Sequence, residues 1–210
     1  TFEGKFPFAK VHYQDNTVPL EISLHSCNPF IPMSVENSSL PLAEFSWTLK
    51  NTTDHNVDVS LCLNMSNPFL SESPDRSNTK GPVINEYYQT GDLKGVKMYP
   101  AIDSTDHRYG EIYFSTDIPD PEIKTKWYIG RWWDNSHDFW HDFAPDGRVK
   151  VNQNAVRNEG GQTTVSSLNV PITMAPGDSA EIPFYISWYM PYRKLEANMA
   201  FDNEEPRESV

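Results

Sequence analysis

The densest group of reactive side chains in the sequence is the stretch Gly130–Phe143, GRWWDNSHDFWHDF. It holds three tryptophans, two phenylalanines, two histidines and three aspartates. On a helix turn, His137 and His141 would face one metal ion, with Asp134 or Asp138 as a third ligand. The surrounding composition instead indicates strand and loop, where residues four apart do not converge. His137, His141 and Asp138 are therefore only weak metal-ligand candidates, and no metal or cofactor is expected.

The same stretch offers a second chemistry, which is sugar recognition. Exposed tryptophans stack on sugar rings because an indole has a large flat apolar face. The sugar-binding candidates are Trp132, Trp133, Trp140 and His137. The competing interpretation is that the tryptophans fill a core or a domain interface while histidine and aspartate satisfy local backbone groups. We favour this packing interpretation.

Motifs of common enzyme classes are missing from the sequence. It contains no Gly-rich phosphate loop, no G-x-S-x-G, no H-E-x-x-H and no C-x-x-C. Nothing marks Cys27 or Cys62 as an activated nucleophile. The 29 acidic residues could supply a glycosidase pair, but sequence spacing does not reveal a separation in space. Most of the acids fall in turns or on the wetter faces of strands, which indicates a solvated acidic surface.

Charge and cysteine content narrow the possible partners. Seventeen basic against 29 acidic residues give a net charge of -12, which repels nucleic-acid phosphates and anionic lipid. No apolar run approaches the roughly 20 residues of a membrane helix. The two cysteines are expected to be free thiols of a reducing compartment. The location of the protein is left unknown, with a cytoplasmic or peripheral-membrane one slightly favoured. The glycosylation sequons at Asn37, Asn51 and Asn64 are too short a pattern to prove secretion.

The dominant pattern has a period of two. Apolar and polar residues alternate in TVPLEISLHSC, LAEFSWTLKN, NVDVSLCLN and AEIPFYISWYM, as in half-buried strands. Ala43–Val59 is predicted to form part of an antiparallel pair, and Pro176-Gly177 a turn between strands at Thr163–Met174 and Ser179–Tyr189. Further strands are predicted at Phe6–Tyr13, Val96–Tyr99, Glu111–Ser115, Lys126–Gly130 and Arg148–Asn154. The fold class is therefore all-β, an antiparallel β-sandwich with long loops.

Two segments interrupt this pattern within an expected single domain over 1–210. Residues 64–93 are polar and rich in turn formers, which predicts a long loop or insertion. The tail 193–210 is charged after a possible short helix near Leu195–Phe201.

Several motifs in series resemble a known family. Residues 4–67 contain FPFA, a strand ending NPFIP, the link NSSLPLAEF and the turn KNTTDHNVDVSL. GDLKGVKM, GRWWD, FAPDGRV and MAPGDSAEIPFYISWYMP follow in the same order. In these motifs the chain resembles the N-terminal domain of family 116 glycoside hydrolases. That family includes the non-lysosomal glucosylceramidases, also called bile acid β-glucosidases, and related microbial β-glucosidases.

The resemblance implies that the parent protein has two domains with different roles. In the family, this region is a β-sandwich packed against a C-terminal (α/α)6 barrel that carries both catalytic carboxylates. The chain would then be a fragment that begins inside the N-terminal domain, and no catalytic residue transfers to it. Two other hypotheses stay open: a free-standing carbohydrate-binding β-sandwich module, and a small enzyme with its own acid pair.

Overall fold

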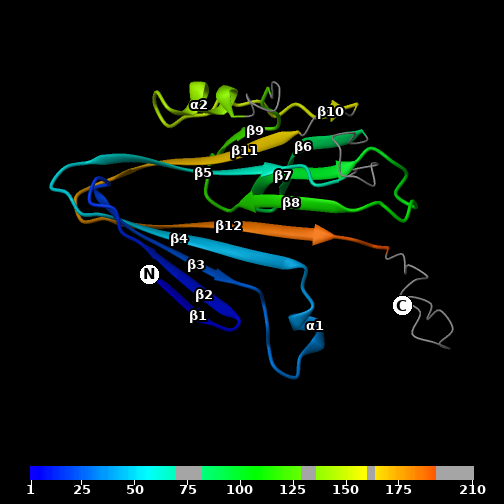
Figure 1. The fold of residues 1–210 in the computed structure, drawn as a ribbon, viewed down its shortest axis with the longest axis horizontal. Coiled ribbons are helices and arrows are strands. Elements are labelled where there is room, and N and C mark those ends of the chain that lie inside the picture. Colours follow the sequence, from blue (N-terminus) through cyan, green and yellow to red (C-terminus); the bar gives the residue numbers. More distant parts are fainter. Residues whose placement is uncertain (70–81, 129–135, 160–163, 193–210) are drawn as a thin grey trace.

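Two antiparallel sheets form the molecule, and they confirm the predicted all-β sandwich (Figure 1). The computed structural model describes residues 1–69, 82–128, 136–159 and 164–192. The larger sheet has nine strands in the order β1-β2-β3-β4-β12-β8-β7-β6-β10, and the smaller has three in the order β5-β11-β9. No helix in the described ranges is long and apolar enough to cross a membrane.

The bounds of the elements are as follows. The strands are β1 (Phe2–Lys5), β2 (Phe8–Tyr13), β3 (Leu20–Cys27), β4 (Leu42–Asn51), β5 (Val57–Ser66), β6 (Val83–Thr90), β7 (Leu93–Pro100), β8 (Glu111–Thr116), β9 (Glu122–Lys124), β10 (Val156–Asn158), β11 (Val165–Met174) and β12 (Ser179–Tyr189). The helices are α1 (Val35–Ser38) and α2 (His137–Phe143).

The main core lies between the two sheets. Alternation along β4 and β12 turns one apolar face inward, so that Leu49 and Phe184 are almost fully buried. Burying a side chain such as Phe184 stabilises the fold by about 1.5–3 kcal/mol. The smaller sheet contributes Ile123, Leu168 and Val170 from the opposite side. The sequence pattern therefore predicted the core face of these strands correctly.

The pairing of consecutive strands differs from the prediction. The stretch Ala43–Val59 was expected to form part of one antiparallel pair, but β4 belongs to the larger sheet and β5 to the smaller. Likewise, the turn at Pro176-Gly177 joins β11 in one sheet to β12 in the other. Both connections are arches between sheets, because β4 pairs with β3 and β12 while β5 pairs with β11, so neither connection joins two paired strands.

Two further strand predictions and the loop prediction were wrong in part. The segment 64–93, expected to be a loop, contains the end of β5 and all of β6. Apolar residues packed against a neighbouring strand outweighed its polar composition, and Val83 is 1% exposed. Residues 126–128 and 148–154 are not in strands, whereas β9 and β10 lie beside these ranges. The predicted tail helix lies outside the described residues.

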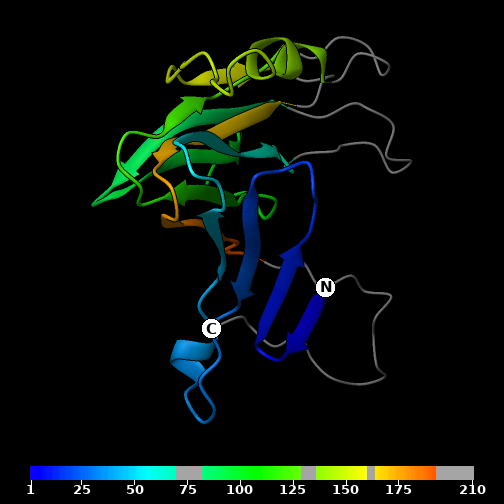
Figure 2. The same ribbon diagram turned by 90° about the vertical axis from the view of Figure 1, so that its left-hand side faces the viewer.

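A third layer covers the outer face of the smaller sheet, where α2 lies (Figure 1), and the turned view shows the same layer above the sheets (Figure 2). Its helical form corrects the strand-and-loop expectation. Phe139 and Phe143, one helical turn apart, both face the sheet, and Phe139 is buried. Asp138 and Asp142, also one turn apart, both bind the Lys124 ammonium of β9, at 3.1 and 3.0 Å. These contacts with the sheet explain the helix better than composition does.

Candidate functional site

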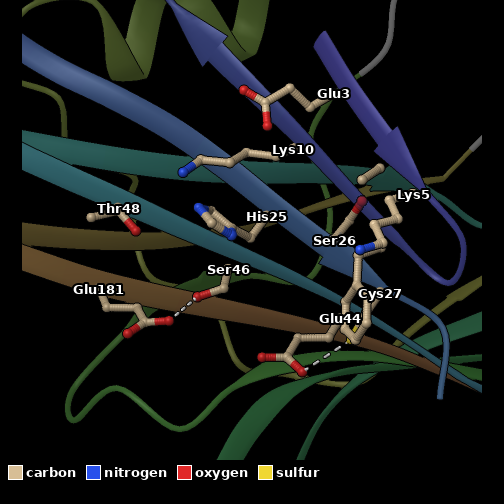
Figure 3. A pocket seen from close by; sticks show the side chains of 12 residues that line it. Glu3, Lys5, Lys10, His25, Ser26, Cys27, Glu44, Ser46, Thr48 and Glu181 are labelled. Carbon is tan, nitrogen blue, oxygen red and sulfur yellow. Dashed lines mark hydrogen bonds between the residues drawn. The ribbon is translucent and has the colours of Figure 1, made fainter. Parts of the chain in front are cut away.

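The outer face of the larger sheet is hollowed into an open cleft of about 590 Å³. Five strands contribute to it: β1, β2, β3, β4 and β12 (Figure 3). The alternation that buries one face of these strands turns their polar side chains outward. The cleft is lined by Glu3, Lys5, Phe8, Ala9, Lys10, His25, Ser26, Cys27, Glu44, Ser46, Thr48 and Glu181.

Strand register brings the polar residues of the cleft into rows. Lys10 stands opposite His25, and His25 stands opposite Ser46, so three strands contribute to one row. In the neighbouring rows Cys27 is opposite Glu44, and Thr48 is opposite Glu181. The result is a mixed surface with ammonium, imidazole, hydroxyl and carboxylate groups. Its size lies within the range of about 300–1,000 Å³ that is usual for small-molecule sites.

Two hydrogen bonds hold side chains at the floor of the cleft (Figure 3). The Ser46 hydroxyl, in a residue only 6% exposed, donates to Glu181 Oε1 at 2.6 Å. The Cys27 thiol donates to Glu44 Oε2 at 3.7 Å. Burial, and then the nearby Glu44 carboxylate, raise the pKa of Cys27 above its ordinary value. A thiol with a raised pKa stays protonated at neutral pH and is a poor nucleophile.

The two floor carboxylates, Glu44 and Glu181, come from backbone positions that the strand register offsets. Glu181 is opposite Thr48, which is four residues along β4 from Glu44. Four residues of strand correspond to about 13 Å. The Ser46 hydrogen bond turns the Glu181 carboxylate toward the part of β4 that lies between Thr48 and Glu44. The cleft therefore has the groups for binding polar ligands, and both of its floor carboxylates accept a hydrogen bond from a neighbouring side chain.

The site residues expected from the sequence lie elsewhere. Trp132, Trp133 and Asp134 fall outside the described residues. Trp140 lies on α2, over the smaller sheet and not at the cleft, and is 56% exposed. His137 shares this helix, and no row of the cleft includes it.

The helix does align the two histidines, contrary to the argument that residues four apart would not converge. His137 and His141 are both exposed, and their rings stack with centroids 6.0 Å apart. Asp138 instead binds Lys124. Across the described ranges, no three histidine, cysteine, aspartate or glutamate side chains gather as metal ligands would.

Sequence reasoning missed the cleft because no single strand encodes it. The alternation of Glu44, Ser46 and Thr48 with apolar residues signals a wetter face of β4. That the wetter faces of five strands join depends on pairings between distant segments, such as Ser46 with Pro183.

The cysteines and sequons can also be placed. Cys27 and Cys62 are both free thiols, on strands of different sheets. Asn37 and Asn64 are exposed, whereas Asn51 is 1% exposed and its side-chain amide is fully engaged in hydrogen bonds. The Asn51 sequon is thus inaccessible in the folded chain.

Comparison with known proteins identifies the class and then the family. Residues 1–203 match a family model for an N-terminal domain of glycoside hydrolases, described as "beta-glucosidase 2, glycosyl-hydrolase family 116 N-term". The chain belongs to this family of N-terminal domains.

Two solved structures match the chain at low similarity. One, from the human microbiome, is provisionally assigned as a kojibiose phosphorylase: identity is 12%, the TM-score is 0.45, and the match covers 87% of this chain and 18% of that one. The other, from Klebsiella pneumoniae, is provisionally assigned as an aldose 1-epimerase: identity is 10%, the TM-score is 0.33, and the match covers 89% and 52% of the two chains. The chain thus spans about a fifth and about half of these proteins.

Proposed function

We propose that the chain is the non-catalytic N-terminal β-sandwich of a family 116-like β-glucosidase or glucosylceramidase. In this proposal it supports a separate C-terminal (α/α)6 domain, which hydrolyses β-glucosides. The observation that carries the proposal is the match of residues 1–203 to the family's N-terminal domain.

The chemistry of the cleft supports a non-catalytic role. Hydrolysis with retention needs a nucleophile and an acid/base carboxyl group about 5–5.5 Å apart. The backbone positions of Glu44 and Glu181, at the floor of the cleft, are offset by four residues of strand, and each carboxylate accepts a hydrogen bond from a neighbouring side chain. Cys27 has a raised pKa, which does not suit a nucleophile. The two catalytic carboxylates of the parent enzyme would therefore come from its other domain.

Hydrolysis of an aryl β-glucoside tests this proposal. The parent protein should release the aryl group, whereas residues 1–210 alone, shown to be folded by circular dichroism, should not. A matched pair of variants, Glu44→Gln and Glu181→Gln, should leave the fold of the isolated chain intact. Turnover by the isolated chain that either variant abolishes would overturn the non-catalytic role.

A second candidate function is sugar binding, and one observation favours it. Trp140 is 56% exposed on α2, where its ring makes edge contacts with Phe139 and Phe143. An exposed indole held by neighbouring rings is suited to stacking on a sugar. A glucoside titration should quench fluorescence in the chain but not in Trp140→Ala if the chain is a carbohydrate-binding module. A flat response of both proteins at millimolar sugar would remove this candidate.

A further inference from the structure

The connection between β3 and β4 exposes an unusual number of large apolar side chains. Met33 is 102% exposed and Val35, at the start of α1, is 82% exposed. We call this patch the connection surface. It consists of Phe6, from the β1–β2 turn, with Phe30, Ile31, Met33, Val35 and Leu40. Contiguous exposed apolar patches of this kind mark interaction sites in soluble proteins.

The backbone beneath the connection surface is ordered by its own hydrogen bonds. The Ser38 hydroxyl donates to the Ile31 carbonyl and accepts from the Ile31 N–H, both at 2.9 Å. Phe6 and Phe30 pack edge to face, with ring centroids 5.0 Å apart. Met33 has φ 69°, which costs energy in a residue other than glycine. The fold thus holds these apolar side chains outward in a defined geometry.

The charge of the segment indicates the chemistry of its partner. Glu36 is the only charged residue among residues 28–41, although 22% of the whole chain is charged. The segment has no lysine or arginine, and the chain carries a net charge of -12. An anionic bilayer surface would therefore repel the molecule. An uncharged, apolar protein surface fits better.

The position of the connection surface indicates which partner covers it. The Trp188 N–H, near the end of β12, donates to the Pro41 carbonyl at 3.0 Å, and Ser187 pairs with Leu42. The end of β12 therefore lies beside the connection, on the side of the molecule that also carries α1 (Figure 1). Tyr189 and Met190, which follow, are also exposed, at 59% and 49%. The residues that directly follow β12 therefore begin beside the connection surface.

A small hollow continues the connection surface toward the cleft. It measures about 300 Å³ and is lined in part by Phe6, Phe8 and Phe45. Phe8, Cys27 and Glu44 line both this hollow and the cleft. A protein seated on the connection surface would therefore border the cleft.

We propose that the connection surface is the face on which the next domain of the same polypeptide packs. This proposal rests on the proposed function, in which a helical catalytic domain follows the sandwich. The occupant is an apolar face of that domain. It covers Met33 and Val35, and it abuts the end of β12.

Methionine oxidation in the intact parent protein tests this contact. Hydrogen peroxide converts exposed methionine to its sulfoxide, and peptide mass spectrometry measures the rate at each position. Met98 and Met174, which are 0% and 2% exposed, give the slow reference. A Val151→Met variant gives the fast reference, because Val151 is 57% exposed and lies outside the connection surface. Met33 should react at least about ten-fold more slowly than the methionine of that variant.

A substitution within the surface then removes the contact. Val35→Asp places a carboxylate at a position that is 82% exposed in the sandwich, so the fold of the sandwich tolerates it. In this variant, Met33 should react as fast as the Val151→Met reference. Continued slow reaction of Met98 and Met174 shows that the sandwich is still folded.

Several results would overturn the contact. The first is fast oxidation of Met33 in the unmodified parent. The second is protection of Met33 that disappears on dilution, which would show that a second copy of the protein covers it. The third is protection of Met33 that requires added phosphatidylserine vesicles, which would show that a membrane covers it. β-Glucoside hydrolysis by the same preparation is measured separately. If hydrolysis is absent while Met33 is protected, the proposed function fails and the domain contact stands.

Discussion

The side-chain amide of Asn51 donates a hydrogen bond of 3.1 Å to the backbone carbonyl of Met174, although the two residues are 123 positions apart. Asn51 ends β4 and Met174 ends β11, so this bond joins the two arches that connect the sheets. The same amide donates to the carbonyls of His55 and Ala175, and the Asn51 backbone N–H donates to Asp178. One buried side chain thus closes one end of the sandwich.

Asn51→Ala should lower the free energy of unfolding by about 2–4 kcal/mol, because buried carbonyl groups lose their donor. Urea unfolding of the isolated chain measures the loss. Asn37→Ala is the matched control, since Asn37 is exposed and its side-chain amide donates to the Ser34 hydroxyl at 2.8 Å. It should change stability by no more than about 0.5 kcal/mol. Equal effects of the two substitutions would show that Asn51 does not hold the arches together.

Gly95 in β7 should not tolerate a side chain. A Cβ there would overlap with the Phe114 carbonyl oxygen and come within 2.7 Å of the Ser115 Cα, both in the paired strand β8. Backbone atoms of a central strand do not yield easily, so Gly95→Ala should cost at least about 2 kcal/mol in thermal or urea unfolding. Gly91→Asn is the control: its site has φ +56° and open space, and asparagine tolerates this conformation. A small cost at Gly95 would mean that β7 and β8 separate readily.

Asp142 should make the stability of the domain depend on pH in acid. Burial works to raise its pKa, but the Lys150 N–H and the Lys124 ammonium outweigh burial and hold the pKa below 3.8. A carboxyl with a lowered folded-state pKa stabilises above its unfolded value, and this contribution is lost as pH falls through the folded pKa.

Asp142→Asn should therefore be less stable than the unmodified chain at pH 6, and the gap should close below about pH 4. Unfolding curves recorded from pH 6 to pH 2.5 give the comparison. In a Lys124→Met background, the stability difference that Asp142→Asn causes should depend less on pH. The reason is that one cation that stabilises the Asp142 carboxylate is gone. A stability difference that does not change with pH would argue that Asp142 acts only through the packing of its side chain and not through its charge.

Cys62 should be inert in the folded chain. Burial beneath the third layer raises its pKa to about 12. The thiolate is the reactive form, so alkylation by iodoacetamide at pH 8 should be slower by about two orders of magnitude or more than in urea. Mass spectrometry of the peptide that contains Cys62 follows the reaction. Similar rates in buffer and in urea would mean that the third layer opens frequently.

The period-two pattern accounts for how much of the fold was predictable. Phe45, Trp47 and Leu49 were assigned to one face of a strand, and all three contribute to the core or pack against it. Local alternation suffices for this, because successive side chains of a strand point to opposite faces. The helix α2 was not predictable in the same way, since Asp138 and Asp142 depend on Lys124, which is brought near by the fold.

By itself, the sequence determined the class of fold, the inward faces of its strands and, through its motifs, the likeness to family 116 N-terminal domains. The tertiary structure decided which sheet each strand joins, and therefore where the cleft and the connection surface lie. Glu44 and Glu181 line one cleft because β4 pairs with β12 across a wide gap in the sequence. Strand pairing of this kind is set by the packing of all the faces together, which alternation within one strand does not encode.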